Sequence, residues 1–505
     1  MLDTRASGIL LHPTSLPGPH GIGSIGAPAR RFLRLLRAMD QSFWQILPLG
    51  PTGYGDSPYQ SLSTFAGNPL LLDLDGLRRD GLFPRGLPAQ RPAFSEDHVD
   101  YGRVIAHRAQ ALRRAASAFP RAASPALRRA HARFVERERH WLDDFALFDA
   151  LKAAHGGRPW TDWPDSLARR QPAALRRARR DLADAIARRT CIQFLFDRQW
   201  RALRRQARRH GIRLVGDFPL FVAHDSADVW ACPEAFRLDH AGRPTVVAGV
   251  PPDYFSPTGQ RWGNPVYAWD RHAGDGYAWW IARVRRALDL ADAVRIDHFR
   301  GLEAYWEIPA DKPTAEHGRW VPGPGMALID ALRAALGDVP LIAEDLGLIT
   351  PAVHALREAA GFPGMRVLPF LLDDLLDDPG RVFEACPEAT VFYTGTHDND
   401  TLCGWLDKLA RGRSETRKAA RRLAAIFAAG AEPLQRRLIR GVLGSRARLA
   451  MTPMQDLLGL GSEARMNTPG REQGNWQWRM APDAPSEDAI AWMRNATRAA
   501  RRMPG

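Results

Sequence analysis

Acidic residues stand at the ends of several short apolar runs in this chain, where strands of a sheet would meet their loops. Asp297 ends the run Ala-Val-Arg-Ile-Asp, and Glu344 follows Leu-Ile-Ala. Asp217 and Asp398 close two similar stretches. If these strand ends share one rim, the carboxylates could cleave a glycosidic bond, one acting as acid and another as nucleophile or base. They could equally bind Mg²⁺ or Ca²⁺ through their oxygens.

Arg295 stands two residues before Asp297, so that both side chains would lie on the same face of a strand. An arginine in that position keeps a neighbouring carboxylate ionised and fixes its direction. For one isolated pair, a purely structural ion pair is the alternative interpretation. The similar carboxylates at other strand ends favour a catalytic role.

Aromatic and neutral polar side chains in the loops favour a sugar over a metal ion. Tryptophan and tyrosine rings can stack on the apolar faces of pyranose rings, and histidine and asparagine suit sugar hydroxyls. Core packing is the alternative for any single aromatic residue. The aromatic candidates are Tyr54, Tyr59, Trp230, Tyr254, Phe255, Trp262, Tyr267, Trp269, Phe362, Trp476 and Trp478, and the polar ones are His298, His397 and Asn467.

Eight strand-like segments carry these residues, and helical segments lie between most of them. This alternation predicts an α/β fold, a (β/α)₈ TIM barrel with inserted, largely helical subdomains, whose catalytic residues gather at the carboxyl ends of the strands. A doubly wound open sheet is the alternative, because periodicity does not show closure. The predicted strands are residues 8–12, 43–48, 213–218, 294–297, 340–345, 365–372, 390–398 and 449–454, and the predicted helices include 29–39, 277–290, 326–336, 351–360 and 415–427.

The whole chain, residues 1–505, is expected to form one catalytic domain on this barrel. Residues 77–190 are rich in Ala, Leu and Arg at helical spacing, which predicts a helical insertion, and 192–209 would be the helix that returns to the barrel. Residues 220–275 are predicted to be a loop-rich insertion that covers the active site.

Composition excludes several function classes. The formal charge of +14 comes mainly from arginines on helical faces, and no nucleic-acid-binding motif accompanies them, so we expect no nucleic-acid partner. No dinucleotide or Walker A motif is present, and we expect neither a cofactor nor a metal ion. The four scattered cysteines and the absence of a long apolar run predict a cytoplasmic protein without a membrane partner.

A series of motifs resembles, in order and over nearly the whole chain, the 4-α-glucanotransferases (amylomaltases or disproportionating enzymes) of the α-amylase superfamily. Three of them contain the acids: Val-Arg-Ile-Asp-His-Phe-Arg at 294–300, Ala-Glu-Asp-Leu-Gly at 343–347 and Tyr-Thr-Gly-Thr-His-Asp-Asn-Asp at 393–400. Further matches lie at residues 12–17, 53–59, 216–219, 225–230, 249–253, 258–265 and 465–470.

The resemblance implies a retaining double displacement that moves α-1,4-glucan segments between chains. Asp297 would be the nucleophile, Glu344 the acid and base, and Asp398 the residue that stabilises the transition state. The implied substrate-binding residues are Tyr59, Asp217, Trp262, Arg295, His298, Asp373, His397 and Asn467, and the implied secondary glucan site consists of Tyr54 and Tyr101.

Two features depart from the family pattern. Pro369 stands in a barrel strand where glutamine is usual, and because proline lacks a ladder donor this strand is expected to be shortened or bulged. Asp373, which follows it, is therefore a weaker candidate for a sugar contact. Arg471 replaces a smaller residue after the motif at 465–470.

The expected partners are α-1,4-glucans and maltooligosaccharides, with glucose as an acceptor, and the expected state is a monomer or a weak homodimer. An α-glucan hydrolase on the same barrel is the main alternative function. A catalytically inactive glucan-binding protein is disfavoured because all three acids are present. Salt-sensitive binding of DNA or RNA would revive a fourth interpretation, a nucleic-acid-binding protein.

Overall fold

The structure is a computed structural model that describes residues 4–83, 92–252, 256–428 and 432–503. Eight parallel strands form its central sheet in the order β10-β11-β12-β1-β2-β3-β6-β9. The outer strands of that order approach each other, since the N–H of Ala343 donates to the carbonyl of Pro363 at 2.9 Å. The strands are β1 (Ala6–Leu10), β2 (Phe43–Gln45), β3 (Arg213–Pro219), β6 (Ala293–Asp297), β9 (Leu341–Ala343), β10 (Gly364–Val367), β11 (Thr390–Tyr393) and β12 (Leu449–Pro453).

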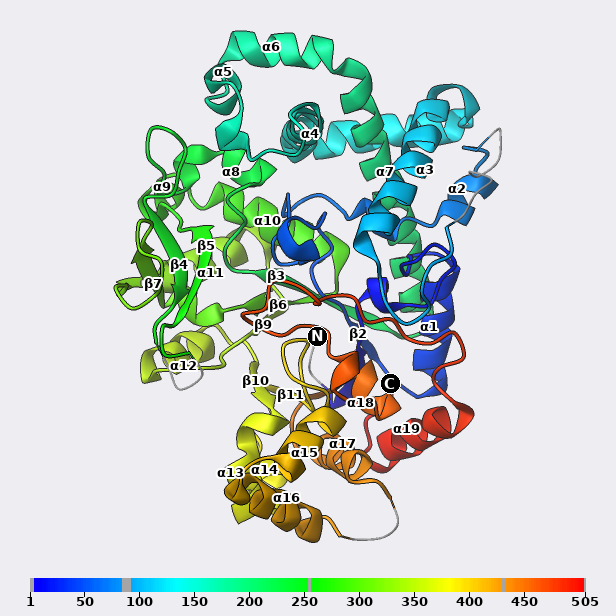
Figure 1. The fold of residues 1–505 in the computed structure, drawn as a ribbon, viewed down its shortest axis with the longest axis vertical. Coiled ribbons are helices and arrows are strands. Elements are labelled where there is room, and N and C mark those ends of the chain that lie inside the picture. Colours follow the sequence, from blue (N-terminus) through cyan, green and yellow to red (C-terminus); the bar gives the residue numbers. More distant parts are fainter. Residues whose placement is uncertain (1–3, 84–91, 253–255, 429–431, 504–505) are drawn as a thin grey trace.

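This sheet is a nearly closed barrel, and all eight predicted strands belong to it, so the (β/α)₈ prediction is confirmed. Figure 1 shows the barrel strands in the middle of the molecule with helices outside them. The surrounding helices include α1 (Ala27–Ala38), α10 (Ala278–Leu290), α11 (Gly325–Leu336), α12 (Pro351–Ala359), α14 (Pro379–Glu384), α15 (Leu402–Arg411), α16 (Ser414–Ile426), α17 (Leu434–Gly444) and α19 (Glu487–Ala499).

A group of helices lies between β2 and β3, along the top of Figure 1. Its last member runs back to β3 and begins earlier than the predicted residue 192. Trp200 on this helix is fully buried and donates its indole N–H to the carbonyl of Leu290 at 2.8 Å, which anchors the group to the barrel. The helices are α2 (Leu74–Arg79), α3 (Tyr101–Ala122), α4 (Pro125–Ala154), α5 (Asp165–Ala168), α6 (Pro172–Asp181) and α7 (Ala183–Arg209).

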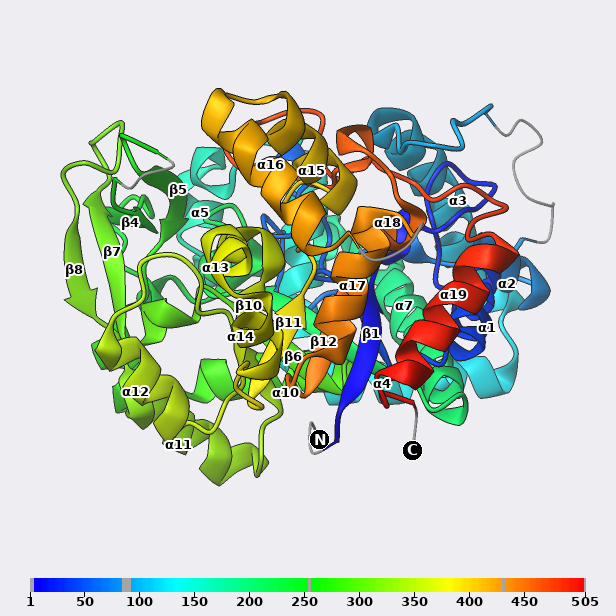
Figure 2. The same ribbon diagram turned by 90° about the horizontal axis from the view of Figure 1, so that it is seen from below.

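A second, antiparallel sheet of four strands lies at one side of the barrel, at the left of Figures 1 and 2. It consists of β4 (Val246–Val250), β5 (Gln260–Pro265), β7 (Ala304–Pro309) and β8 (Arg319–Pro322). This sheet was not predicted from the sequence. β4 pairs with β5 and also with β7, which follows β6 in the chain, so no local hairpin pattern indicates all four strands.

The expectation of a shortened strand around Pro369 is confirmed. β10 ends at Val367 and continues into a 3₁₀ helix, Leu368–Leu371, and then α13 (Leu372–Asp377). Proline cannot donate to a ladder, and at the start of a helical turn its missing N–H has no consequence. The predicted strand 365–372 was therefore too long. The remaining short helices are α8 (Ala227–Ala231), α9 (Trp269–Gly274) and α18 (Met454–Leu458).

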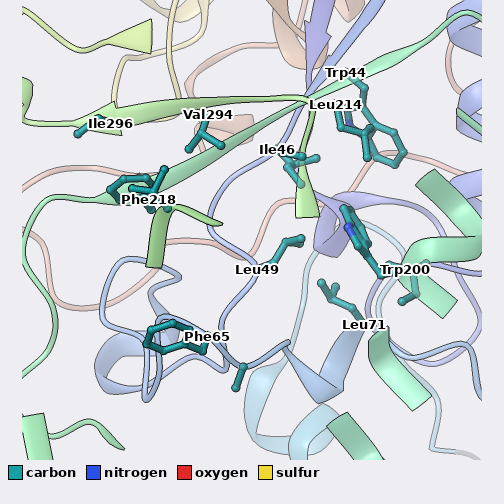
Figure 3. Packing of buried hydrophobic residues seen from close by; sticks show 14 of the residues in the cluster. Trp44, Ile46, Leu49, Phe65, Leu71, Trp200, Leu214, Phe218, Val294 and Ile296 are labelled. Atoms are coloured by element: carbon teal, nitrogen blue, oxygen red, sulfur yellow. The ribbon is translucent and has the colours of Figure 1, made fainter. Parts of the chain in front are cut away.

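Alternation along β6 decides which side chains face the barrel interior. Val294 and Ile296 pack outward in the large cluster under the helices, part of which Figure 3 shows. Ala293 belongs to the separate cluster inside the barrel. Because successive side chains alternate across a strand, Arg295 and Asp297 continue the inward row of Ala293. The charged pair thus sits above an apolar barrel core, at the carboxyl end of its strand.

Candidate active site

Asp217 and Asp297 come from neighbouring strands and share one arginine. In the register of β3 and β6, Asp217 pairs with Arg295 and Pro219 with Asp297. The Nη1 atom of Arg295 lies 3.0 and 2.9 Å from the two carboxylate oxygens of Asp217, and its Nη2 atom lies 2.8 Å from Oδ1 of Asp297. One guanidinium therefore orients both carboxylates.

These two carboxylates differ in exposure. The side chain of Asp217 is fully buried, whereas that of Asp297 is 31% exposed and open to a ligand. Burial raises the pKa of Asp217 to about 6 against the attraction of Arg295, which leaves it ionised at neutral pH. Burial opposes the charge on Arg295, but the two aspartates outweigh it and raise its pKa.

Glu344 stands beside Asp297 on the adjoining strand. Ile296 pairs with Ala343, and the N–H of Glu344 extends the ladder by donating to the carbonyl of Ile296 at 3.1 Å. Asp297 and Glu344 therefore directly follow the last paired residues of two adjacent strands, which lie ~4.8 Å apart. Burial and the charge of Asp297 raise the pKa of Glu344 to about 7, while Arg295 opposes the shift.

Two backbone N–H groups hold the carboxyl group of Glu344. His298 donates to Oε2 at 2.6 Å and Leu346 donates to Oε1 at 3.0 Å. His298 adopts the left-handed conformation, with φ 56° and ψ 45°, which turns the chain sharply after the strand. Such a conformation is uncommon for a residue other than glycine and clusters at functional sites. Burial lowers the pKa of His298 to about 4, so its imidazole is neutral at pH 7.

His397 and Asp398 follow β11, and their side chains are in contact. Nε2 of His397 lies 3.3 Å from Oδ2 of Asp398, and the side-chain amide of Asn467 donates to Oδ1 at 2.5 Å. Burial would raise the pKa of Asp398, but His397 and Asn467 outweigh it and the net shift is downward. Burial likewise opposes the charge on His397, yet Asp398 raises its pKa overall.

Tyr59 connects the two groups of charged residues. Its hydroxyl donates to Oδ2 of Asp217 at 2.9 Å and lies 3.5 Å from Nδ1 of His397. The rings of Tyr59 and His397 are stacked, with their centroids 4.9 Å apart. Contacts therefore run continuously from Asp297 through Arg295, Asp217, Tyr59 and His397 to Asp398.

Comparisons with known proteins decide which family has this arrangement. The family model described as "4-alpha-glucanotransferase" matches residues 11–484. The chain belongs to the 4-alpha-glucanotransferase family.

Individual relatives are similar to this chain over almost its whole length. The 4-alpha-glucanotransferase of Thermus thermophilus is 52% identical over 99% of each chain, and that of Synechocystis is 47% identical over 96% of this chain and 95% of the relative. The amylomaltase from Streptococcus agalactiae, solved in complex with acarbose, has a TM-score of 0.93 and 37% identity, over 99% of this chain and 100% of that one.

The family motif at 258–265 brings Trp262 to the site on β5. Its ring meets that of His298 edge to face, with the centroids 4.8 Å apart, and its indole N–H donates to Gln260 at 3.2 Å. The second sheet thus contacts the residue that follows Asp297. Tyr254 and Phe255, the other aromatic candidates of this insertion, lie outside the described residues.

Three residues that the family resemblance suggested lie apart from this network. Tyr54 is 72% exposed, whereas Tyr101 is buried at the start of α3 and donates its hydroxyl to the carbonyl of Trp476 at 3.1 Å. Asp373 is exposed in the first turn of α13. The secondary glucan site stays a prediction, and of its two residues Tyr54 is the exposed one.

Three further residues near Asp398 had no predicted role. His12 follows β1 and lines a cavity together with His397, and burial lowers its pKa to about 3. The guanidinium of Arg465 donates to the main-chain carbonyl of Asp398. The carboxylate of Asp456 accepts hydrogen bonds from Thr394 and Leu402, which lie at the two ends of the loop that contains Asp398. His12 stands at a strand end, which was a usable signal. Arg465 and Asp456 act through contacts that no local pattern shows.

Over the residues that the structure describes, no set of three or more His, Cys, Asp or Glu side chains converges as metal ligands would. Arg295 occupies the space between Asp217 and Asp297 instead. Across the same residues, no helix combines the length and apolarity that crossing a membrane requires.

Proposed function

We propose that this member of the 4-alpha-glucanotransferase family cuts an α-1,4-glucan donor and transfers the segment to the 4-hydroxyl of another glucan or of glucose. The reaction would proceed by double displacement through a covalent β-glucosyl-enzyme. The observation that carries this proposal is Asp297, a partly exposed carboxylate held by Arg295 next to Glu344, a carboxyl group with a pKa of about 7.

In the first step the carboxylate of Asp297 attacks the anomeric carbon while Glu344 protonates the departing oxygen. Arg295 holds the carboxylate of the nucleophile in one direction. Since the pKa of Glu344 is about 7, a substantial fraction still carries its proton at neutral pH. Glu344 thus supplies the proton, while the contact with Arg295 directs Asp297 at the anomeric carbon.

In the second step Glu344 acts as the base. Its carboxylate removes the proton from the 4-hydroxyl of the acceptor, which attacks the glucosyl-enzyme and releases Asp297. Two inversions at the same carbon retain the α configuration. This outcome requires the two carboxyl groups to lie roughly 5–5.5 Å apart, consistent with adjacent positions on neighbouring strands.

The remaining polar residues would bind the sugar ring. Asp398 is ionised and held by His397 and Asn467, and it would favour the positive charge that develops on the sugar in the transition state. Tyr59 and His298 border the same space and would contact ring hydroxyls.

Transfer in place of hydrolysis needs water to be kept from the glucosyl-enzyme. We propose that the insertion at 220–275 covers the site, with Trp262 on β5 closing the side next to His298. One barrel domain would suffice for activity as a monomer or a weak homodimer. The free cysteines suit a reducing, cytoplasmic compartment.

Product analysis on pure maltotriose tests this function. A glucanotransferase converts it into glucose and longer maltooligosaccharides without a net gain of reducing ends. A steady rise in reducing ends would show an α-glucan hydrolase instead. Unchanged maltotriose with the purified, folded protein would contradict both activities.

A further inference from the structure

The loop that carries His397 and Asp398 is longer than the roughly 2–6 residues of an ordinary loop between a strand and the next helix. β11 ends at Tyr393 and α15 begins at Leu402, so residues 394–401 have no strand or helix of their own. Loops of this kind sample many conformations unless other segments hold them. We call residues 394–401 the acid loop.

Both ends of the acid loop are tied to one buried carboxylate. Asp456, on α18 after β12, accepts a hydrogen bond from the hydroxyl of Thr394 at 2.7 Å through Oδ2. Its Oδ1 accepts from the backbone N–H of Leu402 at 2.6 Å. Asp456 is 1% exposed and does not contact the other acids described above. A carboxylate buried this deeply is stable only because both oxygens are paired.

The middle of the acid loop is tied to the same segment by Arg465. Its Nη2 atom donates to the carbonyl of Asp398 at 2.5 Å, and its Nε atom donates to the carbonyl of Asn467 at 2.6 Å. The N–H of Asn467 donates to the carbonyl of His397 at 3.0 Å. Arg465 thus links the main chain of Asp398 to Asn467, whose side-chain amide binds the Asp398 carboxylate.

Packing does not replace these bonds on that side of the loop. A cavity of about 30 Å³ lies beside the acid loop, and its lining includes Thr396, His397, Asp400, Gln455, Asp456 and Arg465. A space of this size holds water rather than side chains. If the bonds were lost, the loop would have room to move.

We propose that Asp456 and Arg465 are positioning residues, which fix the acid loop from residues 454–467 so that Asp398 meets the sugar ring in a single orientation. The inference rests on the proposed function, in which Asp398 contacts the sugar. In this proposal Asp456 and Arg465 act through the acid loop and not by binding the sugar. A displacement of 1 Å at a catalytic group can cost about 100-fold in rate.

Arg465→Met tests the contact at the middle of the acid loop. Arg471→Met is a matched control, because Arg471 is an exposed arginine shortly after this segment. With maltotriose, kcat of the Arg465 variant should fall about 100-fold while KM changes little, and the control should behave as wild type. A wild-type kcat in Arg465→Met would overturn the proposal.

A double-mutant cycle separates positioning from a merely structural role. With maltotriosyl fluoride as donor, Arg465→Met should cost less than about threefold in an Asp398→Asn background, because the group that it positions is already impaired. An equal loss in both backgrounds would overturn the proposal while leaving the proposed function intact. Full activity of Asp398→Asn alone would instead contradict the proposed function.

Asp456 provides the second test. Asp456→Asn can keep both ties, since its oxygen still accepts from Leu402 and its amide donates to the Thr394 hydroxyl. The asparagine variant should retain most of the wild-type kcat. The alanine variant should have a much lower kcat, measured at a temperature well below that at which this variant unfolds. If the alanine variant does not fold, Thr394→Val removes one tie alone and should lower kcat at unchanged KM. Wild-type kcat in the folded alanine variant, or in Thr394→Val, would overturn the role of Asp456.

Discussion

The Nη2 atom of Arg295 lies 2.8 Å from the Oδ1 atom of Asp297, on the inner side of one barrel strand. The other arm of the same guanidinium is bound to a buried carboxylate on the neighbouring strand. A planar guanidinium held in this way cannot rotate without breaking both pairs. The direction of the proposed nucleophile is therefore set by the barrel itself.

Asp297→Asn should abolish turnover of maltotriose, by about 10⁴-fold or more, because an amide cannot form the glucosyl-enzyme. The fold and much of the glucan affinity should remain, since the side chain keeps its shape. Initial rates and calorimetric titration with a maltooligosaccharide measure the two quantities. Normal turnover in this variant would remove the proposed mechanism.

Arg295→Met should both destabilise the protein and inactivate it. It leaves Asp217 buried beside a second carboxylate with no cation, and breaking a buried pair in this way costs about 3–5 kcal/mol. Arg295→Lys should recover part of the stability but little of the activity, because an ammonium group lacks the fork that holds two carboxylates. Urea unfolding and kcat are the measurements. Equal activity of the lysine variant and wild type would contradict the orienting role.

Glu344→Gln should lower kcat/KM for maltotriose by about 10²–10⁴-fold, the range of a lost general acid. A donor with a good leaving group, such as maltotriosyl fluoride, should restore the first half-reaction, because fluoride departs without protonation. Release of fluoride in a single turnover measures this step. If the activated donor reacts no faster than maltotriose, the acid role of Glu344 is wrong.

The pH dependence of kcat/KM should reveal the titration of Glu344. Burial and the charge of Asp297 raise the pKa of Glu344 to about 7, so its proton is present below that pH and lost above it. Accordingly, kcat/KM for maltotriose should decline as pH rises through about 7, and Glu344→Gln should lack this limb. A wild-type profile that is flat from pH 6 to 8 would contradict this assignment.

Trp262→Ala should shift the enzyme from transfer toward hydrolysis, because water would then reach the site past His298. Trp320→Ala is a suitable control: Trp320 belongs to the same antiparallel sheet, on β8, and its ring packs on Arg300. Reducing ends formed per maltotriose consumed should rise in the first variant only. An unchanged ratio in Trp262→Ala would argue against a covering role for β5.

The barrel could be predicted because its strands show local patterns. Most are short apolar runs followed by a segment with the apolar periodicity of an amphipathic helix. Alternation of side chains along a strand places Arg295 and Asp297 on one face. The antiparallel sheet could not be predicted, because its central pairing joins β4 to β7, which lies beyond β6 in the chain. Pro369 was a correct local signal of a shortened strand.

The sequence alone determined that the acidic residues lie at the ends of strands. It also determined which of them share a face, because successive side chains on a strand point to opposite faces. Only the tertiary structure decided their protonation. Glu344 has a pKa of about 7, and that of Asp398 is lowered. The physical reason is that burial and the charges of Arg295, Asp297 and His397 set these values, and folding brings those groups together from distant segments.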